Sequence, residues 1–169
     1  MLVRSIWNWV RDENRPLSTL LDALKNHAIS RDWDQIACQL SEKIIATEIY
    51  RSPALFIPCP SRDRGVPNHA FEFAEALSRF WQVGLQSPLG YEPNGSAQKN
   101  KTLLERGHRA FVCDEKFSMV ESKSSLIVFV DDVITTGYTA RAAYRALGKP
   151  KHFEVWCVAN RRLATEGSF

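Results

Sequence analysis

The sequence predicts an α/β fold with a mainly parallel central sheet flanked by helices. The first observation is an unbroken apolar run at 126–130, typical of a strand buried on both faces of a parallel sheet. The second is the helical spacing of apolar residues after residue 139, which Gly148 and Pro150 end. A short apolar run at 54–57 followed by a helical pattern at 68–83 repeats this order, as expected of parallel α/β sheets.

The composition is that of an ordinary globular protein. The 169 residues are 44% hydrophobic and 24% charged, and a chain of this length buries about 70% of its unfolded surface as one domain. No apolar run is long enough to span a membrane, and residues 1–15 lack the apolar stretch of a signal peptide. We therefore expect a cytoplasmic protein without a membrane span.

Cysteine, histidine and charge patterns exclude several classes of site. The four cysteines form no C-x-x-C pair, so neither a zinc site nor a disulfide framework is predicted. The histidines show no metal-ligand spacing, and each is interpreted as a surface or capping residue: His27, His69, His108 and His152. A net charge of +3 is too small to indicate nucleic-acid binding by itself, although it suits a phosphate-rich small ligand.

Residues 1–50 are predicted to form a helical segment that packs on the core. Pro16 is expected to start one helix, and apolar residues at helical spacing over 33–44 predict another. Ile45 and Ile49 are expected to widen the apolar face of that second helix. Trp7 and Trp9 are placed in a short helix, with packing on the body and contact with a partner both left open.

The middle of the chain contains two polar loops. The loop after the strand at 54–57 holds Cys59, Ser61, Arg62 and Arg64, and arginines in such a loop suit pyrophosphate, although a solvated surface turn is the alternative. A helix is expected from about Asn68 to Val83, ended by Gly84. The long loop at 88–101 and its basic continuation form either a closing lid or a solvated connector, with these polar residues: Gln98, Lys99, Lys101 and Arg106.

The turn after the apolar run is predicted to hold an anion. The first amides of a helix have no acceptor in their own helix, and the helix dipole adds about half a positive charge there. Gly137 allows close approach of a ligand, and nearby threonine hydroxyls add donors. Asp131 and Asp132, placed just beyond the strand's carboxyl end, would repel a phosphate. They are therefore expected to address sugar hydroxyls or a Mg²⁺ ion through water.

The run IVFVDDVITTGYT resembles the phosphoribosyl pyrophosphate (PRPP) signature of type I phosphoribosyltransferases. The alternatives are a buried strand with a polar turn, and a Walker B strand, which needs a G-x-x-x-x-G-K-[ST] loop that this chain lacks. The resemblance implies the type I phosphoribosyltransferase fold for residues 51–169. It also implies these 5′-phosphate-binding residues: Thr135, Thr136, Gly137, Tyr138 and Thr139.

Two further stretches are similar to the ComF (competence protein F) family. They are PCPSRDRGVPNHAFEFAEAL and QKNKTLLERGHRAF, and with the central motif the likeness covers about residues 54–160. The chain departs from that family in having only Cys38 where a four-cysteine module usually stands, and in one extra residue between Arg64 and Ala70. Thr135 stands where purine-salvage relatives often carry an acid, which argues against hypoxanthine-type salvage.

The resemblance implies ribose hydroxyls on Asp131 and Asp132, and pyrophosphate with Mg²⁺ on the loop from Cys59 to Arg64. Mg²⁺ would be held through ligand and water rather than by protein ligands alone. One hypothesis is a Mg²⁺-dependent phosphoribosyltransferase with an unidentified acceptor. The other is a non-catalytic PRPP-binding accessory protein of DNA uptake, which leaves single-stranded DNA, DNA-uptake proteins and a second copy of the chain open as partners.

Overall fold

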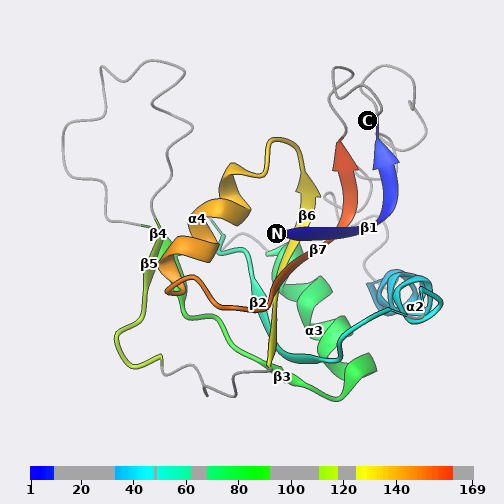
Figure 1. Ribbon diagram of the computed structural model, residues 1–169, viewed down its shortest axis with the longest axis horizontal. Coiled ribbons are helices and arrows are strands. Elements are labelled where there is room, and N and C mark those ends of the chain that lie inside the picture. Colours follow the sequence, from blue (N-terminus) through cyan, green and yellow to red (C-terminus); the bar gives the residue numbers. More distant parts are fainter. Residues whose placement is uncertain (10–32, 48, 62–67, 92–110, 118–124, 162–169) are drawn as a thin grey trace.

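The computed structural model describes residues 1–9, 33–47, 49–61, 68–91, 111–117 and 125–161 (Figure 1). The strands are β1 (Leu2–Trp9), β2 (Pro53–Pro58), β3 (Gly84–Leu85), β4 (Leu89–Tyr91), β5 (Phe111–Cys113), β6 (Leu126–Ile134) and β7 (Phe153–Arg161). The helices are α2 (Trp33–Ile45), α3 (His69–Trp81) and α4 (Tyr138–Ala146).

Five strands form one parallel sheet in the order β1-β7-β6-β2-β3. The apolar run at 126–130 forms part of β6 at the centre, and all five of its residues are buried. The prediction of a mainly parallel sheet flanked by helices is therefore confirmed, and β6 lies in the middle because its side chains are apolar on both faces.

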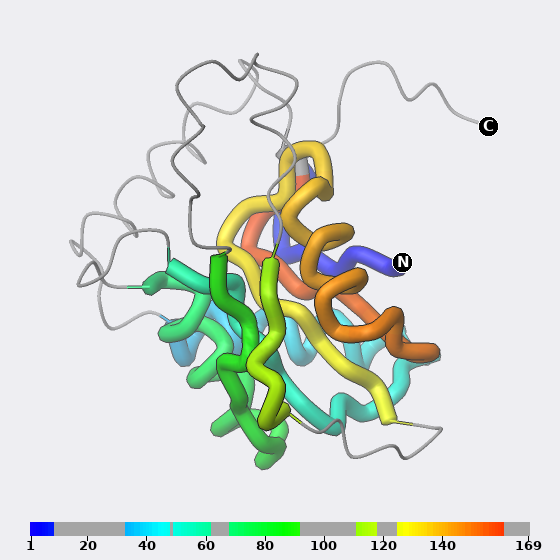
Figure 2. The backbone as a smooth tube through the Cα atoms, turned by 90° about the vertical axis from the view of Figure 1, so that its left-hand side faces the viewer, coloured from blue at the N-terminus to red at the C-terminus, as the bar shows by residue number. Residues whose placement is uncertain are grey.

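Helices cover both faces of this sheet (Figure 1). On one face, α2 and α3 pack against β2, β6 and β7 around Phe56, Phe73 and Trp156. On the other face, α4 packs with the separate β4–β5 pair, which Figure 2 shows as two adjacent strands. The carboxyl ends of β2 and β6 lie between these two layers, which is where parallel sheets place ligands.

The prediction of a short helix around Trp7 and Trp9 is wrong. Leu2–Trp9 is an edge strand that pairs in parallel with β7, in a register that places Trp7 opposite Ala159. Trp7 is partly buried and packs against the core cluster of α2 and α3. This strand obtains its backbone hydrogen bonds from a segment about 150 residues away, so no local pattern revealed it. The expected division at residue 50 stays a prediction.

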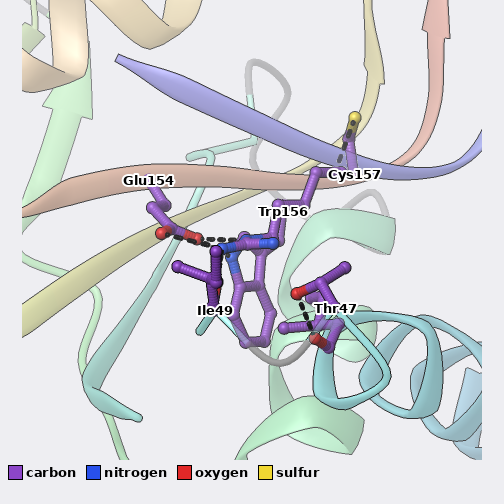
Figure 3. Close-up of polar contacts among 7 residues, drawn as sticks. Thr47, Ile49, Glu154, Trp156 and Cys157 are labelled. Atoms are coloured by element: carbon purple, nitrogen blue, oxygen red, sulfur yellow. Dashed lines mark hydrogen bonds and ion pairs between the residues drawn. The ribbon is translucent and has the colours of Figure 1, made fainter. Parts of the chain in front are cut away.

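Arg4 anchors β1 to the amino end of β7 through Glu154. Figure 3 shows Glu154 beside the Trp156 indole. Its Nε donates to Glu154 Oε2 at 2.7 Å, and its Nη2 donates to Glu154 Oε1 at 3.4 Å. The Trp156 indole Nε1 donates to the same Oε2 at 2.9 Å. Because the Arg4 and Glu154 side chains are only 14% and 12% exposed, this network is a structural ion pair in a largely buried setting.

The helix predicted over 33–44 is confirmed as α2, whose buried face includes Trp33, Ile36 and Leu40. The apolar face does not widen as expected, because Ile45 and Ile49 are exposed. Ile45 is the last helical residue and Ile49 lies beyond the helix. The helix expected after Pro16 lies outside the described residues. Within the described part of the chain, no helix is long and apolar enough to cross a membrane.

The predicted helix at 68–83 is confirmed as α3, with Asn68 as its N-cap. Its C-terminal end differs from the prediction, because Gln82 rather than Gly84 takes the left-handed conformation, at φ 54°. Gly84 instead begins β3, beside Leu55 of β2. The predicted start of the long loop, at residue 88, is also wrong. Leu89–Tyr91 is instead a strand that pairs with Phe111–Cys113.

Candidate functional site

A cleft of about 310 Å³ opens at the carboxyl end of the sheet, between α3 and α4. Segments from four parts of the chain border it: the end of β2, the start of α3, the end of β4, and the stretch from β6 to α4. The lining residues are Cys59, Pro60, Ser61, Asn68, His69, Ala70, Tyr91, Asp131, Asp132, Val133, Thr135 and Thr139.

Two carboxylates of β6 form one wall of the cleft. The strand extends to Ile134, so Asp131 and Asp132 lie within it and not beyond its end as predicted. The extension has a clear cause, because β7 continues alongside and pairs Cys157 with Asp131 and Ala159 with Val133. Asp131 Oδ1 accepts from the Asp132 amide at 3.0 Å, and Asp132 Oδ1 accepts from the Val133 amide at 2.7 Å. These bonds hold both carboxylates at the cleft.

The turn between β6 and α4 places the helix start against the cleft. Gly137 is the N-cap of α4 and has φ 69°, a left-handed conformation that favours glycine. The helical hydrogen bonds begin with the Arg141 amide, which donates to the Gly137 carbonyl at 3.0 Å. Thr135 and Thr139 line the cleft on either side of this turn. The binding of an anion at this helix start stays a prediction.

Arg141 braces the outside of the same turn. Its Nη2 donates to the Thr136 carbonyl at 2.7 Å, and its guanidinium lies 4.8 Å from the centre of the Tyr138 ring. Tyr138 is half exposed, and Thr136 is also exposed. Thr136, Gly137 and Tyr138 are not among the residues that line the cleft. The Thr136 carbonyl and the Tyr138 ring instead contact Arg141.

The opposite wall is held by two side chains that sequence reasoning did not place in the site. Asn68 Nδ2 donates to the Cys59 carbonyl at 2.8 Å, while its Oδ1 accepts from the Phe71 amide at 3.3 Å. The Tyr91 hydroxyl donates to the Pro60 carbonyl at 3.3 Å. Asn68 thus joins the loop after β2 to the start of α3, and Tyr91 joins it to β4.

His69 also faces the cleft, so its interpretation as a surface or capping residue is wrong. Its side chain is 16% exposed, and its Nδ1 lies 3.7 Å from Glu72 Oε2. The cap of α3 is its neighbour Asn68. One local signal marked these two residues, since they lie a few positions after the candidate pyrophosphate loop. No local signal marked Tyr91, which enters the site only through the pairing of β4 with β5.

Two observations concern nucleophilic and metal-binding chemistry near the cleft. Burial raises the pKa of the Cys157 thiol, and the neighbouring charge of Asp131 adds to this, so this cysteine stays protonated and is a poor nucleophile. Among the described residues, no group of three or more His, Cys, Asp or Glu side chains is placed to hold a metal ion.

The structure brings part of the predicted site together. Six of the predicted residues line one cleft: Cys59, Ser61, Asp131, Asp132, Thr135 and Thr139. Thr136, Gly137 and Tyr138 are described but are not in its lining. Six more fall outside the described residues: Arg62, Arg64, Gln98, Lys99, Lys101 and Arg106. The binding roles of all these residues stay predictions, and the contribution of the long basic loop does too.

No protein-family model and no curated protein sequence matches the chain. Among solved structures, adenine phosphoribosyltransferase from Leishmania donovani superposes with a TM-score of 0.50 at 12% identity, covering 96% of this chain and 90% of that one. Purine phosphoribosyltransferase from Pyrococcus horikoshii gives a TM-score of 0.48 at 15% identity, over 80% of this chain and 89% of that one. The chain has the type I phosphoribosyltransferase fold, as the Leishmania superposition shows. The ComF assignment stays a prediction.

Proposed function

We propose that the protein binds PRPP in the cleft and transfers its phosphoribosyl group to an acceptor. The observation that carries this proposal is the single strand-turn-helix that borders the cleft. From it, Asp131 and Asp132 contribute carboxylates, and Thr135 and Thr139 flank a helix start. A phosphorylated sugar needs both features, since its ester end requires donors and its hydroxyls require acceptors.

In this proposal the turn from Thr135 to Thr139 binds the 5′-phosphate. Amides at the start of α4 and the threonine hydroxyls donate to phosphate oxygens, and the left-handed Gly137 lets the backbone approach them closely. Asp131 and Asp132 accept from the ribose hydroxyls. Cys59, Ser61 and the arginines that follow in the sequence bind pyrophosphate.

The carboxylate pair also suits a Mg²⁺ ion that arrives with the ligand. Mg²⁺ keeps several waters and is commonly bound by one or two carboxylates together with phosphate oxygens. Asp131 and Asp132 both border the cleft and provide this donor set. When bound, the ion would neutralise charge that develops on the pyrophosphate.

The proposed reaction is a displacement at the ribose C1 carbon. The bond from C1 to the pyrophosphate oxygen breaks, and its electron pair leaves with pyrophosphate. The acceptor forms the new bond to C1 and releases its proton. Because the ribose acquires positive charge in the transition state, two carboxylates near the ring stabilise it, while donors at the opposite wall stabilise the leaving group.

Two measurements test this proposal. Calorimetry with PRPP and Mg²⁺ should detect binding, and pyrophosphate release should be followed across a panel of bases and amines. Binding with turnover supports the transferase. Binding with no turnover for any acceptor supports the accessory role instead, and absence of PRPP binding rejects both.

A further inference from the structure

We propose that His69 binds the pyrophosphate end of the ligand. This inference rests on the proposed function and names a residue of that site that no sequence motif identified. It assigns the imidazole to the leaving group and not to the 5′-phosphate or the ribose.

The position of His69 points to the pyrophosphate side. His69 is the first residue of α3 and lines the cleft together with Cys59 and Ser61. Its neighbour Asn68 binds the Cys59 carbonyl at 2.8 Å, which fixes the candidate pyrophosphate loop to the start of this helix. The candidate 5′-phosphate turn belongs to a different segment, at the start of α4, and α3 and α4 pack mainly on opposite faces of the sheet.

The side chains of Glu72 and Trp33 support the imidazole of His69. Glu72 Oε2 lies 3.7 Å from its Nδ1, and the same oxygen accepts a hydrogen bond from Trp33 Nε1 at 3.0 Å. The Trp33 ring stacks on the imidazole with a centroid distance of 6.2 Å and an angle of 29°. Trp33 is buried, so both the carboxylate and the ring have a rigid support on α2.

The charge of the cleft gives this imidazole a role. Asp131 and Asp132 are acidic, and among the described lining residues His69 has the one basic side chain. Cys59 and Tyr91 are the other titratable groups on the lining, and neither becomes cationic. When the bond from C1 to oxygen breaks, the electron pair moves to pyrophosphate, and an imidazole N–H donates to that growing charge.

The test separates the two ends of the ligand. Calorimetry would measure three probes against the full chain: PRPP with Mg²⁺, inorganic pyrophosphate with Mg²⁺, and ribose 5-phosphate. His69→Ala should weaken PRPP and pyrophosphate binding by about tenfold or more, the size of a hydrogen bond to a charged group. Ribose 5-phosphate affinity should not change. His69→Gln, which keeps a neutral donor, should lie between wild type and His69→Ala.

His152→Ala is the matched control, because His152 precedes β7 at the amino end of the sheet, away from the cleft lining. It should leave all three affinities unchanged. Equal loss for all three probes in His69→Ala, or no loss for any, overturns the inference while the proposed function stands. A wild-type protein that binds pyrophosphate through His69 but neither PRPP nor ribose 5-phosphate rejects the proposed function alone. Wild-type protein that binds none of the probes rejects both.

Discussion

The two ends of the parallel sheet use acidic residues in opposite ways. At the amino end, Glu154 accepts from Arg4 and from the Trp156 indole, which joins β1 to β7. At the carboxyl end, Asp131 and Asp132 accept from backbone amides of their own strand and border an open cleft. The comparison shows that the surroundings of an acid on an inner strand determine its role. Glu154 is structural because a guanidinium and an indole donate to it, whereas Asp131 and Asp132 are available to a ligand because they border a cleft.

Breaking the amino-end network should have the largest effect on stability. Glu154→Ala leaves the largely buried Arg4 guanidinium and the Trp156 N–H without the carboxylate that they share, so the free energy of unfolding should fall by about 3 kcal/mol. Urea denaturation measures this loss. Any PRPP-induced stabilisation should persist, because the network lies away from the cleft.

The double variant Arg4→Met with Glu154→Leu sharpens this result. Replacing both partners by apolar side chains removes the unpaired charge, so much of the lost stability should return. If the double variant is as unstable as Glu154→Ala, the ion pair is not the cause of the effect.

At the carboxyl end, Asp131→Asn combined with Asp132→Asn should abolish stabilisation by the ligand. PRPP at a hundred times its dissociation constant should stabilise the wild type by about 2.7 kcal/mol. The apo variant should still fold, since an asparagine Oδ1 can accept the same backbone amides. Thermal melts with and without PRPP and Mg²⁺ measure the shift. An unchanged shift in the double variant contradicts the role assigned to the two aspartates.

A smaller effect is expected at the turn before α4. Gly137→Ala forces an alanine to φ 69°, which should cost about 1 kcal/mol of stability and weaken ribose 5-phosphate binding. Gly148→Ala is the matched control, because Gly148 follows the same helix with φ 74° and nothing lies within 4 Å of the added carbon. The control should lose similar stability without loss of binding. Equal binding losses in both variants, measured by calorimetry, argue against the phosphate cradle.

The last effect is absent at neutral pH and concerns the buried thiol beside Asp131. Because burial raises the pKa of Cys157 in the folded protein, the unfolded thiol ionises first as the pH rises. Stability contributed by the protonated thiol is therefore fully present below the unfolded pKa of about 8.5 and declines above it. Urea denaturation should be measured at pH values around 7 and 10. The free energy of unfolding should fall less between these two pH values for Cys157→Ala than for the wild type. Identical losses would mean that Cys157 is not responsible.

Local patterns carried much of the fold prediction. The central strand, α3 and α4 were predicted within a few residues, because an apolar run and helical spacing are properties of neighbouring residues. Four residues of the cleft lining could also be predicted from neighbouring residues, because they belong to one continuous motif: Asp131, Asp132, Thr135 and Thr139. Cys59 and Ser61 were predicted because polar loop residues directly follow a strand.

The tertiary structure alone decided the remaining features. Leu2–Trp9 became a strand only by pairing with β7, and Tyr91 reached the cleft only by pairing with Phe111. His69 acquired its setting from Trp33, 36 positions earlier on another helix. The sequence by itself determined the strand-turn-helix and its charges, since these depend on adjacent residues. Pairing between distant strands and packing between helices determined which other side chains meet it, because those contacts depend on the whole chain's arrangement in space.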